Sequence, residues 1–185
     1  MTLPMRTPLL ILDLDETLVW ATETASAKDF DFRVFRYDVI KRPNLDVFLR
    51  KAFSWFEVAV WTSSGEGYAQ QVVKEVFNDP SSLGFVWTAS RCIQRVDAET
   101  GEAHALKDLK KVRSRGYALE RVLMIDDSPE KLRRQYGNHL RLGPFEGDPN
   151  DSELLDVLPF LEWLKDQENF RRVEKRNWRS WRRPR

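Results

Sequence analysis

The chain has 185 residues, of which 42% are hydrophobic and 12% aromatic. This length is typical of one domain, or of one domain with a small appendage, and the composition excludes a wholly disordered chain. No apolar run approaches the roughly 18 residues of a membrane span, and the first residues lack a secretory cleavage site. A single cysteine, Cys92, forbids an intrachain disulfide. We therefore expect no membrane contact and a cytoplasmic location, nuclear if the source is eukaryotic.

The formal net charge of +1 conceals an uneven distribution along the chain. Residues 171–185 contain eight Lys or Arg and one acidic residue, whereas residues 1–170 contain 22 basic and 28 acidic residues. An acidic body is thus followed by a basic tail in which Arg and Trp alternate. Such a segment could bind nucleic acid, remain a solubilising mobile terminus, or dock on the body by charge complementarity.

Short apolar runs alternate with amphipathic segments, which is typical of an α/β domain with a mostly parallel central sheet flanked by helices. In chain order we expect a strand at Leu9–Leu14, an extended segment at Phe30–Ile40, a helix at Asn44–Phe53, a strand at Phe56–Trp61, a helix at Glu66–Phe77, short strands in Phe85–Leu106, a helix at Asp108–Ser114, a strand at Arg121–Ile125, a helix at Ser128–Tyr136, a strand at His139–Leu142 and a helix at Asp151–Asp166.

Three details refine these expectations. The apolar alternation changes phase at Val34–Phe35, as a bulge or a strand switch requires. A hairpin turn is expected at Asp97–Glu102, and Pro159 should bend or divide the last helix. We predict a domain over residues 1–168, with a small β insertion at about 79–106, and a tail over 169–185.

Polar groups follow the ends of three predicted strands and begin one helix. In open α/β sheets the carboxyl ends of the strands meet at one edge, where ligands bind. Several carboxylates in one cleft repel each other unless a cation neutralises them, and an all-oxygen ligand set favours Mg²⁺. One carboxylate could then attack phosphorus as a nucleophile. The groups that we expect at this edge are Asp13, Asp15, Thr62, Lys107, Asp126 and Asp127.

The segment Asp13-Leu14-Asp15-Glu16-Thr17-Leu18 resembles the first motif of the haloacid dehalogenase (HAD) superfamily, and the other groups resemble its second, third and fourth motifs in the right order. More narrowly, DLDETLV (13–19), KRPNLDVFL (41–49), FEVAVWTSS (56–64), RVLMIDDSP (121–129) and DSELLDVLPFLEWL (151–164) resemble the small phosphatases that act on the C-terminal domain of RNA polymerase II, the NLI-interacting-factor-like branch. The resemblance covers about residues 8–165.

The resemblance implies an HAD-like Rossmannoid domain with a small β insertion and no large cap domain. It also implies roles. The expected nucleophile is Asp13, and Asp15 is the general acid/base, whose backbone carbonyl would also touch the metal. The expected phosphate-binding and charge-neutralising groups are Thr62 and Lys107, and the remaining Mg²⁺ ligands are Asp126 and Asp127.

Two weaker candidates for phosphate contact are Ser63 and Arg91, for which the alternatives are a turn residue and a solvated arginine. The sequence also departs from the family pattern. Trp20 follows the first motif where the family often has His, and Ala89 stands where an arginine is usual, with Arg91 displaced by two positions. The catalytic roles do not depend on these positions, whereas specificity for polymerase-tail repeats does.

The sequence thus predicts a Mg²⁺-dependent phosphomonoesterase with an aspartyl-phosphate intermediate. Because the spans Leu18–Trp61 and Ser63–Leu106 hold no insertion large enough for a full cap, we expect an open site and a phosphoserine or phosphothreonine protein substrate. The alternative is a phosphatase for nucleic-acid ends or a small metabolite. Rivals from other classes are a receiver-like phospho-accepting domain and a non-catalytic phospho-binding module.

Overall fold

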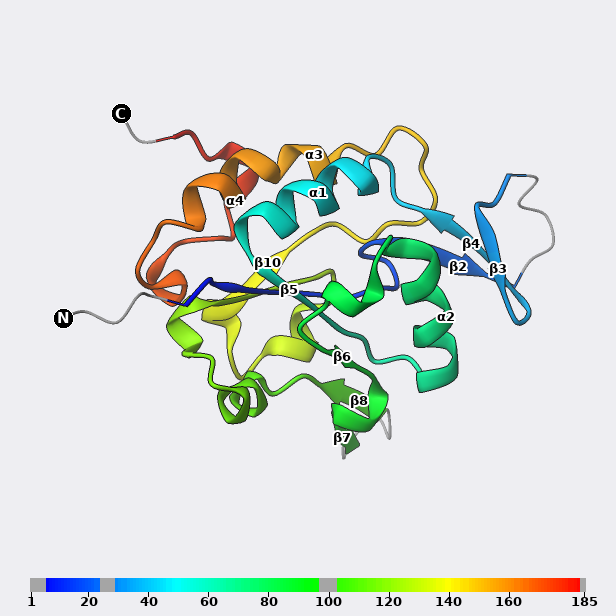
Figure 1. The fold of residues 1–185 in the computed structure, drawn as a ribbon, viewed down its shortest axis with the longest axis horizontal. Coiled ribbons are helices and arrows are strands. Elements are labelled where there is room, and N and C mark those ends of the chain that lie inside the picture. The colour runs from blue at the N-terminus through cyan, green and yellow to red at the C-terminus, as the bar shows by residue number, and fades with distance from the viewer. Residues whose placement is uncertain (1–5, 24–28, 97–102, 184–185) are drawn as a thin grey trace.

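The computed structural model describes residues 6–23, 29–96 and 103–183. Its centre is a five-stranded sheet whose strands all run parallel, in the spatial order β10-β9-β1-β5-β6 (Figure 1). Parallel neighbours need a crossover between them, and the helical segments of this chain supply the crossovers. The strands of this sheet are β1 (Leu9–Leu12), β5 (Glu57–Trp61), β6 (Val86–Trp87), β9 (Val122–Asp126) and β10 (His139–Arg141).

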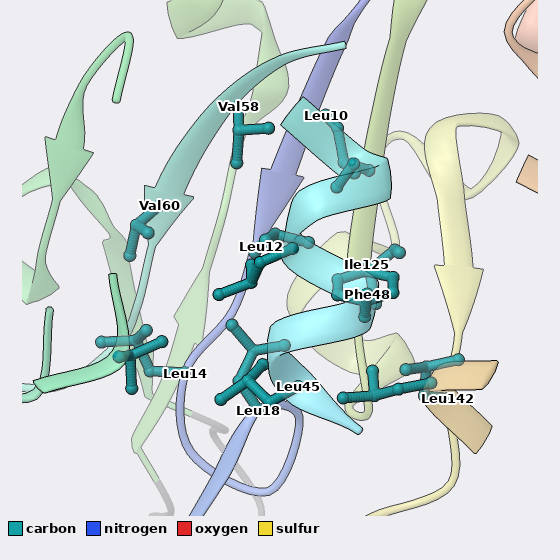
Figure 2. Close-up of a cluster of buried hydrophobic side chains, with 14 of the residues drawn as sticks. Leu10, Leu12, Leu14, Leu18, Leu45, Phe48, Val58, Val60, Ile125 and Leu142 are labelled. Atoms are coloured by element: carbon teal, nitrogen blue, oxygen red, sulfur yellow. The ribbon is translucent and has the colours of Figure 1, made fainter. Parts of the chain in front are cut away.

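The four α-helices pack against one face of the central sheet. Their buried residues and the side chains of this face form one hydrophobic cluster. The helices are α1 (Leu45–Trp55), α2 (Glu66–Val76), α3 (Glu153–Asp156) and α4 (Leu158–Leu164). Figure 2 shows α1 lying over the strands, with Phe48 near Leu12 and Ile125. The apolar positions of α1 follow helical spacing, and each fully buried side chain of this size contributes about 1.5–3 kcal/mol.

Alternate residues of the same strands, such as Ile11, Ala59 and Met124, belong to a second cluster, because successive side chains of a strand point to opposite faces. Short 3-10 helices cover this face. They are η3 (Leu109–Arg115), η4 (Leu119–Arg121), η5 (Pro129–Leu132) and η6 (Tyr136–Asn138). The predicted α/β fold with a parallel sheet flanked by helices is confirmed, but the helices expected at Asp108–Ser114 and Ser128–Tyr136 are 3-10 segments.

The extended segment supplies two strands of a second sheet, which is antiparallel with the order β2-β4-β3, and the third strand, β2, was not predicted from the sequence. Its strands are β2 (Val19–Thr22), β3 (Phe32–Val34) and β4 (Tyr37–Lys41). The expected phase change at Val34–Phe35 marks a switch from one strand to the next and not a bulge. It is the turn of the β3–β4 hairpin, where Phe35 has a φ of 53°.

A third sheet pairs β7 (Ile93–Val96) with β8 (Ala103–Leu106) and forms the small insertion. The predicted turn between them, Asp97–Glu102, lies outside the described residues. The last helical segment is divided into α3 and α4 near Pro159, which confirms one of the two alternatives predicted from the sequence. Pro159 is the second residue of α4, where the missing N–H leaves no intrahelical bond unmade.

The described part of the basic tail packs on the body, with 3-10 turns at η7 (Phe170–Arg172) and η8 (Trp178–Ser180). The side chains of Phe170 and Trp178 are buried. The indole Nε1 of Trp178 donates to the carbonyl of Arg141 at 2.9 Å, and Trp181 lies 5.6 Å from the ring of Phe160. Residues 170–181 therefore dock on the body, through apolar contacts as well as the expected charge complementarity, such as the ion pair of Arg179 with Glu153, while binding of the tail to nucleic acid stays a prediction. The domain boundary at residue 168 stays a prediction.

Candidate active site

The first loop carries two aspartates past the end of β1. The amide of Asp13 donates to the carbonyl of Ile125 at 3.0 Å, which extends the ladder between β1 and β9 by one residue. The chain then turns, because the amide of Leu18 bonds the carbonyl of Leu14 at 2.8 Å and Glu16 adopts a φ of 58°. Because of this turn, the side chains of Asp13 and Asp15 point in different directions.

Three buried carboxylates gather at the ends of β1 and β9. One ligand oxygen from each of Asp13, Asp126 and Asp127 lies within 4.8 Å of the others, and we call these three the carboxylate cluster. The ammonium of Lys107, wholly buried, lies 2.9 Å from Oδ2 of Asp13 and 2.6 Å from Oδ2 of Asp126. A second ammonium, that of Lys131 on η5, lies 3.2 Å from the same Asp13 oxygen.

Charges in this site do not balance. Counting Asp15, four carboxylates face two lysines, which leaves an excess of two negative charges at full ionisation. Burial raises the pKa of Asp126 to about 7, and the charge of Asp13 adds to the shift. For Asp13 burial acts in the same direction, but the two lysines outweigh it and hold its pKa below the ordinary value.

The side chain of Asp15 points away from the cluster and toward α2. Its Oδ2 accepts a hydrogen bond from the hydroxyl of Ser64 and its Oδ1 one from the phenol of Tyr68, both at 2.6 Å. Burial raises the pKa of Asp15 even though both hydrogen bonds oppose the shift. The same contact raises the pKa of Tyr68, chiefly through burial and the charge of Asp15.

The remaining aspartates are held by neighbours that orient them. The hydroxyl of Ser128 donates to Oδ2 of Asp127 at 2.9 Å, and its amide donates to Oδ1 of Asp126 at 2.9 Å. From the edge strand, Nε of Arg141 donates to the backbone carbonyl of Asp127 at 3.0 Å. Outer contacts of this kind fix the direction of carboxylates that bind a cation.

The predicted phosphate-binding residues lie in different surroundings. The side chain of Thr62 is buried at the end of β5, where its hydroxyl accepts from the amide of Ser64 at 3.0 Å. Ser63 is half-buried and makes no side-chain hydrogen bond with another described residue. Arg91 is exposed, and its guanidinium lies 5.4 Å from the ring centroid of Trp87. No described contact joins Arg91 to the cluster, so its role stays a prediction.

Three residues of the site were missed by sequence reasoning. Lys131 follows the DDSP segment (126–129) by two positions. A lysine so close to a pair of aspartates is the signal that could have identified it. Ser64 is the last residue of FEVAVWTSS (56–64), and the sequence assigned it no role of its own. Tyr68 lies in the first turn of α2, on the side that faces the end of β1.

A pocket of about 350 Å³ opens beside Asp15. Its walls include Trp20 of β2 and the rings of Tyr37 and Tyr68, which meet edge to face at 5.8 Å. The site therefore consists of a buried acidic cluster next to an open, largely aromatic recess. Among the described residues no separate domain covers it.

Comparison with known proteins connects this geometry to a family. Residues 8–171 match the family model described as NLI interacting factor-like phosphatase. The "CTD small phosphatase-like protein 2" of Dictyostelium discoideum is 36% identical over 170 residues, covering 88% of this chain and 28% of that protein. The "CTD nuclear envelope phosphatase 1 homolog" of Caenorhabditis elegans is 29% identical over 190 residues, covering 95% of this chain and 74% of the relative.

Among solved structures, that of Fcp1, described as an essential RNA polymerase II CTD phosphatase, is similar with a TM-score of 0.55 and 20% identity. The match covers 91% of this chain and 58% of that chain, and at this identity it shows the HAD-like fold alone. The chain spans less than a third of the Dictyostelium relative and about three quarters of the nematode one.

The relatives correct the expected location. Several of them are named for the nuclear envelope, including proteins from Caenorhabditis elegans, Xenopus laevis and Saccharomyces cerevisiae. These names contradict the cytoplasmic location that the sequence suggested. No helix in the described part of the chain is long and apolar enough to cross a bilayer.

Proposed function

The chain belongs to the NLI interacting factor-like phosphatases, and we propose that it is a Mg²⁺-dependent protein phosphatase that removes phosphate from phosphoserine and phosphothreonine through an aspartyl-phosphate. One observation carries the proposal. The buried carboxylates of Asp13, Asp126 and Asp127 converge beside Lys107, with an excess of negative charge that suits a divalent cation.

The donor set fits the metal. Three carboxylate oxygens within 4.8 Å of one another offer the hard oxygen ligands that Mg²⁺ prefers, and these three carboxylates outnumber the two lysines that face them. Asp13, Asp126 and Asp127 would hold it, Asp127 directly or through water. When bound, Mg²⁺ supplies neutralisation of the phosphoryl oxygens that develop charge during transfer.

In the first step a carboxylate oxygen of Asp13 forms a bond to phosphorus, and the bond from phosphorus to the serine or threonine oxygen breaks. Asp15 gives its proton to the leaving alkoxide; its raised pKa is compatible with that task. In the second step water attacks phosphorus, Asp15 takes a proton from it, and the bond to Asp13 breaks to release phosphate.

Lys107 stabilises the negative charge of the transferring phosphoryl group, and Thr62 binds one of its oxygens. The ammonium of Lys107 already bridges Asp13 and Asp126, so it is positioned where phosphoryl oxygens would approach the nucleophile. Positioning and electrostatic stabilisation supply most of the catalysis in this class of reaction.

A protein substrate is favoured by the open recess beside Asp15 and by the relatives named as phosphatases of a polymerase C-terminal domain. A nucleic-acid substrate would gain its affinity from Arg and Trp of the tail. However, the ring of Trp178 is buried and that of Trp181 is half-buried against Phe160, which leaves the two indoles little free surface for stacking on bases.

The test compares Asp13→Asn with the matched control Asp46→Asn, an exposed acid of α1. Both variants are assayed with Mg²⁺ or with a chelator on phosphopeptides, 3′-phosphorylated DNA and phosphorylated metabolites. We expect phosphopeptide turnover that needs the metal and is abolished only by Asp13→Asn. Full activity of Asp13→Asn would overturn the mechanism, and faster turnover of DNA ends or metabolites would overturn the substrate class.

A further inference from the structure

A second pocket, of about 660 Å³, lies on the β10 side of the sheet, between η6 and the C-terminal segment. It is separate from the recess beside Asp15, with which it shares no lining residue. Its lining is strongly basic, with one acidic side chain among five Lys and Arg. These residues are Arg141, Arg171, Arg172, Glu174, Lys175 and Arg176.

The wall that carries these arginines is fixed in place. A Cβ at Gly137 of η6 would lie 3.2 Å from the carbonyl oxygen of Arg171, so a larger residue here would push the two closely packed segments slightly apart. Lys175 is buried, and its Nζ donates to the carbonyls of Phe170 at 2.5 Å and Val173 at 2.7 Å. The basic side chains of residues 171–176 are therefore presented by a folded wall.

Several donors of this wall are free to bind a ligand. Arg172 has no side-chain hydrogen bond or ion pair with another residue that the structure describes, and Arg171 lies 3.9 Å from its only acidic neighbour. Arg176 is different, because it is paired with Glu174 at 2.6 Å. Arg141 uses only Nε for Asp127, which leaves its two terminal nitrogens without a described partner. Planar guanidinium groups match phosphate oxygens in geometry and charge.

The pocket also adjoins the carboxylate cluster. Arg141 and Asp126 are register partners on neighbouring strands, and Pro129, which lines the pocket, follows Asp127 by two residues. Neighbouring strands lie about 4.8 Å apart, and an extended peptide advances about 3.3 Å per residue. A group bound beyond β10 lies roughly two to three strand spacings from the cluster, which is about three to four residues of a fully extended peptide, or about five of a less extended one, from a phosphoserine at Asp13.

We propose that this pocket binds a second phosphate group of the protein substrate, three to five residues from the phosphoserine or phosphothreonine that is hydrolysed. The inference rests on the proposed function and specifies its substrate class: proteins phosphorylated at closely spaced sites.

The experiment uses the full chain carrying Asp13→Asn, which binds without turnover, and fluorescent peptides of one sequence with one phosphoserine or with a second one three, four or five residues away. Fluorescence anisotropy gives the dissociation constants. We expect at least one doubly phosphorylated peptide to bind about tenfold more tightly than the singly phosphorylated one. Adding Arg172→Glu should bring the ratio near one, whereas the control Arg113→Glu, an exposed arginine of η3 outside the pocket, should keep it.

A variant that binds the second phosphate more tightly gives a test that misfolding cannot explain, because a misfolded chain would lose affinity. Glu174→Gln should release Arg176 from its ion pair and increase the preference for the second phosphate. The proposal is overturned if no spacing gives a preference, if Arg172→Glu leaves the preference intact, or if Arg113→Glu reduces it equally. It is also overturned if a 3′-phosphorylated oligonucleotide outcompetes the peptides through Arg172, which would assign the pocket to nucleic acid.

Failure of the proposed function has a different signature. If the wild-type chain hydrolyses no phosphopeptide with Mg²⁺ while the preference of Asp13→Asn is present, the phosphatase assignment fails and a phosphate-binding pocket stands. If singly phosphorylated peptides are hydrolysed and no preference exists, the pocket fails and the phosphatase assignment stands.

Discussion

Two of the groups of buried charges in this domain, the pair Arg42–Asp151 and the carboxylate cluster, are built in opposite ways. Arg42 clamps Asp151 with Nε at 2.8 Å from Oδ1 and Nη2 at 2.7 Å from Oδ2, and its Nη1 donates to the carbonyl of Thr17. Each of its nitrogens has a partner and the charges of the pair cancel. The carboxylate cluster instead sets three carboxylates against two lysines and, when fully ionised, retains one negative charge that they do not neutralise.

The difference separates a structural ion pair from a catalytic site. A balanced, bidentate pair needs nothing further, and it joins the first loop to the segment that precedes α3. An unbalanced cluster costs folding free energy unless a cation enters. Both groups are buried, so burial does not distinguish them. The carboxylate cluster differs from the structural ion pair in its excess of negative charge.

The largest expected effect separates the two groups by activity. Asp13→Asn should lower kcat on a phosphopeptide by at least about 10⁴-fold, because it removes the nucleophile. Asp151→Asn should leave kcat within a few-fold, since this residue touches no reacting atom. Steady-state kinetics at saturating Mg²⁺ measures both, and similar losses in the two variants would contradict the contrast.

The next effect separates them by stability. Arg42→Met should lower the free energy of unfolding by about 3 kcal/mol, because it leaves the carboxylate of Asp151 largely buried without its partner. Denaturant unfolding measures the loss. The double variant Arg42→Met with Asp151→Leu should recover much of it, and a double variant no better than the single one would argue against the pair.

A smaller effect concerns how Asp15 is oriented. Tyr68→Phe removes the phenol that donates to Oδ1 of Asp15 and should lower kcat by about tenfold. Because this hydrogen bond lowers the pKa of Asp15, its loss should move the basic limb of the kcat–pH profile upward. Gln70→Ala, an exposed position of the same helix, is the control. An unchanged profile would limit Tyr68 to packing.

The smallest effect is the response to pH. Arg42 holds the pKa of Asp151 low against the effect of burial, so the stability from this pair is lost as the pH falls below about 4. Asp126 has a raised pKa of about 7, so its destabilising charge develops as the pH rises toward 7. Mg²⁺ should therefore raise Tm more at pH 8 than at pH 6. At saturation we expect the gain in Tm at pH 8 to exceed the gain at pH 6 by about 3–6 °C.

Differential scanning fluorimetry with and without Mg²⁺ at the two pH values gives this comparison. Asp126→Asn should show no gain at either pH, because the ligand that competes with protons is gone. An equal gain at both pH values in the wild-type chain would mean that Asp126 does not titrate in this range.

The sequence was informative where periodicity is strong and where polar groups follow strands. Residues of β1, β5 and β9 are apolar runs, and the polar residues after them could be assigned to one edge because parallel strands end there. It was less informative about short helices. Pro129 and the few residues after it give a 3-10 turn, since so short a segment has no room for the repeated bonds of an α-helix.

Contacts between distant segments were the hardest to foresee. Lys131 enters the site from a turn, and the arginines of the tail are positioned by Trp178 and Phe170, which belong to the main hydrophobic cluster. Local composition predicts a charged tail, but which side chains anchor it depends on a surface that only the folded body provides.

The hydrogen bond from Trp178 to the carbonyl of Arg141 has a further consequence. β10 is an outer strand of the sheet, and an uncovered outer strand offers its backbone to other chains. The C-terminal segment occupies part of this edge, so its removal would expose both an apolar surface and a template for intermolecular pairing. Shortening the chain before Phe170 should favour aggregation, and the basic residues are therefore better studied by point substitution than by deletion.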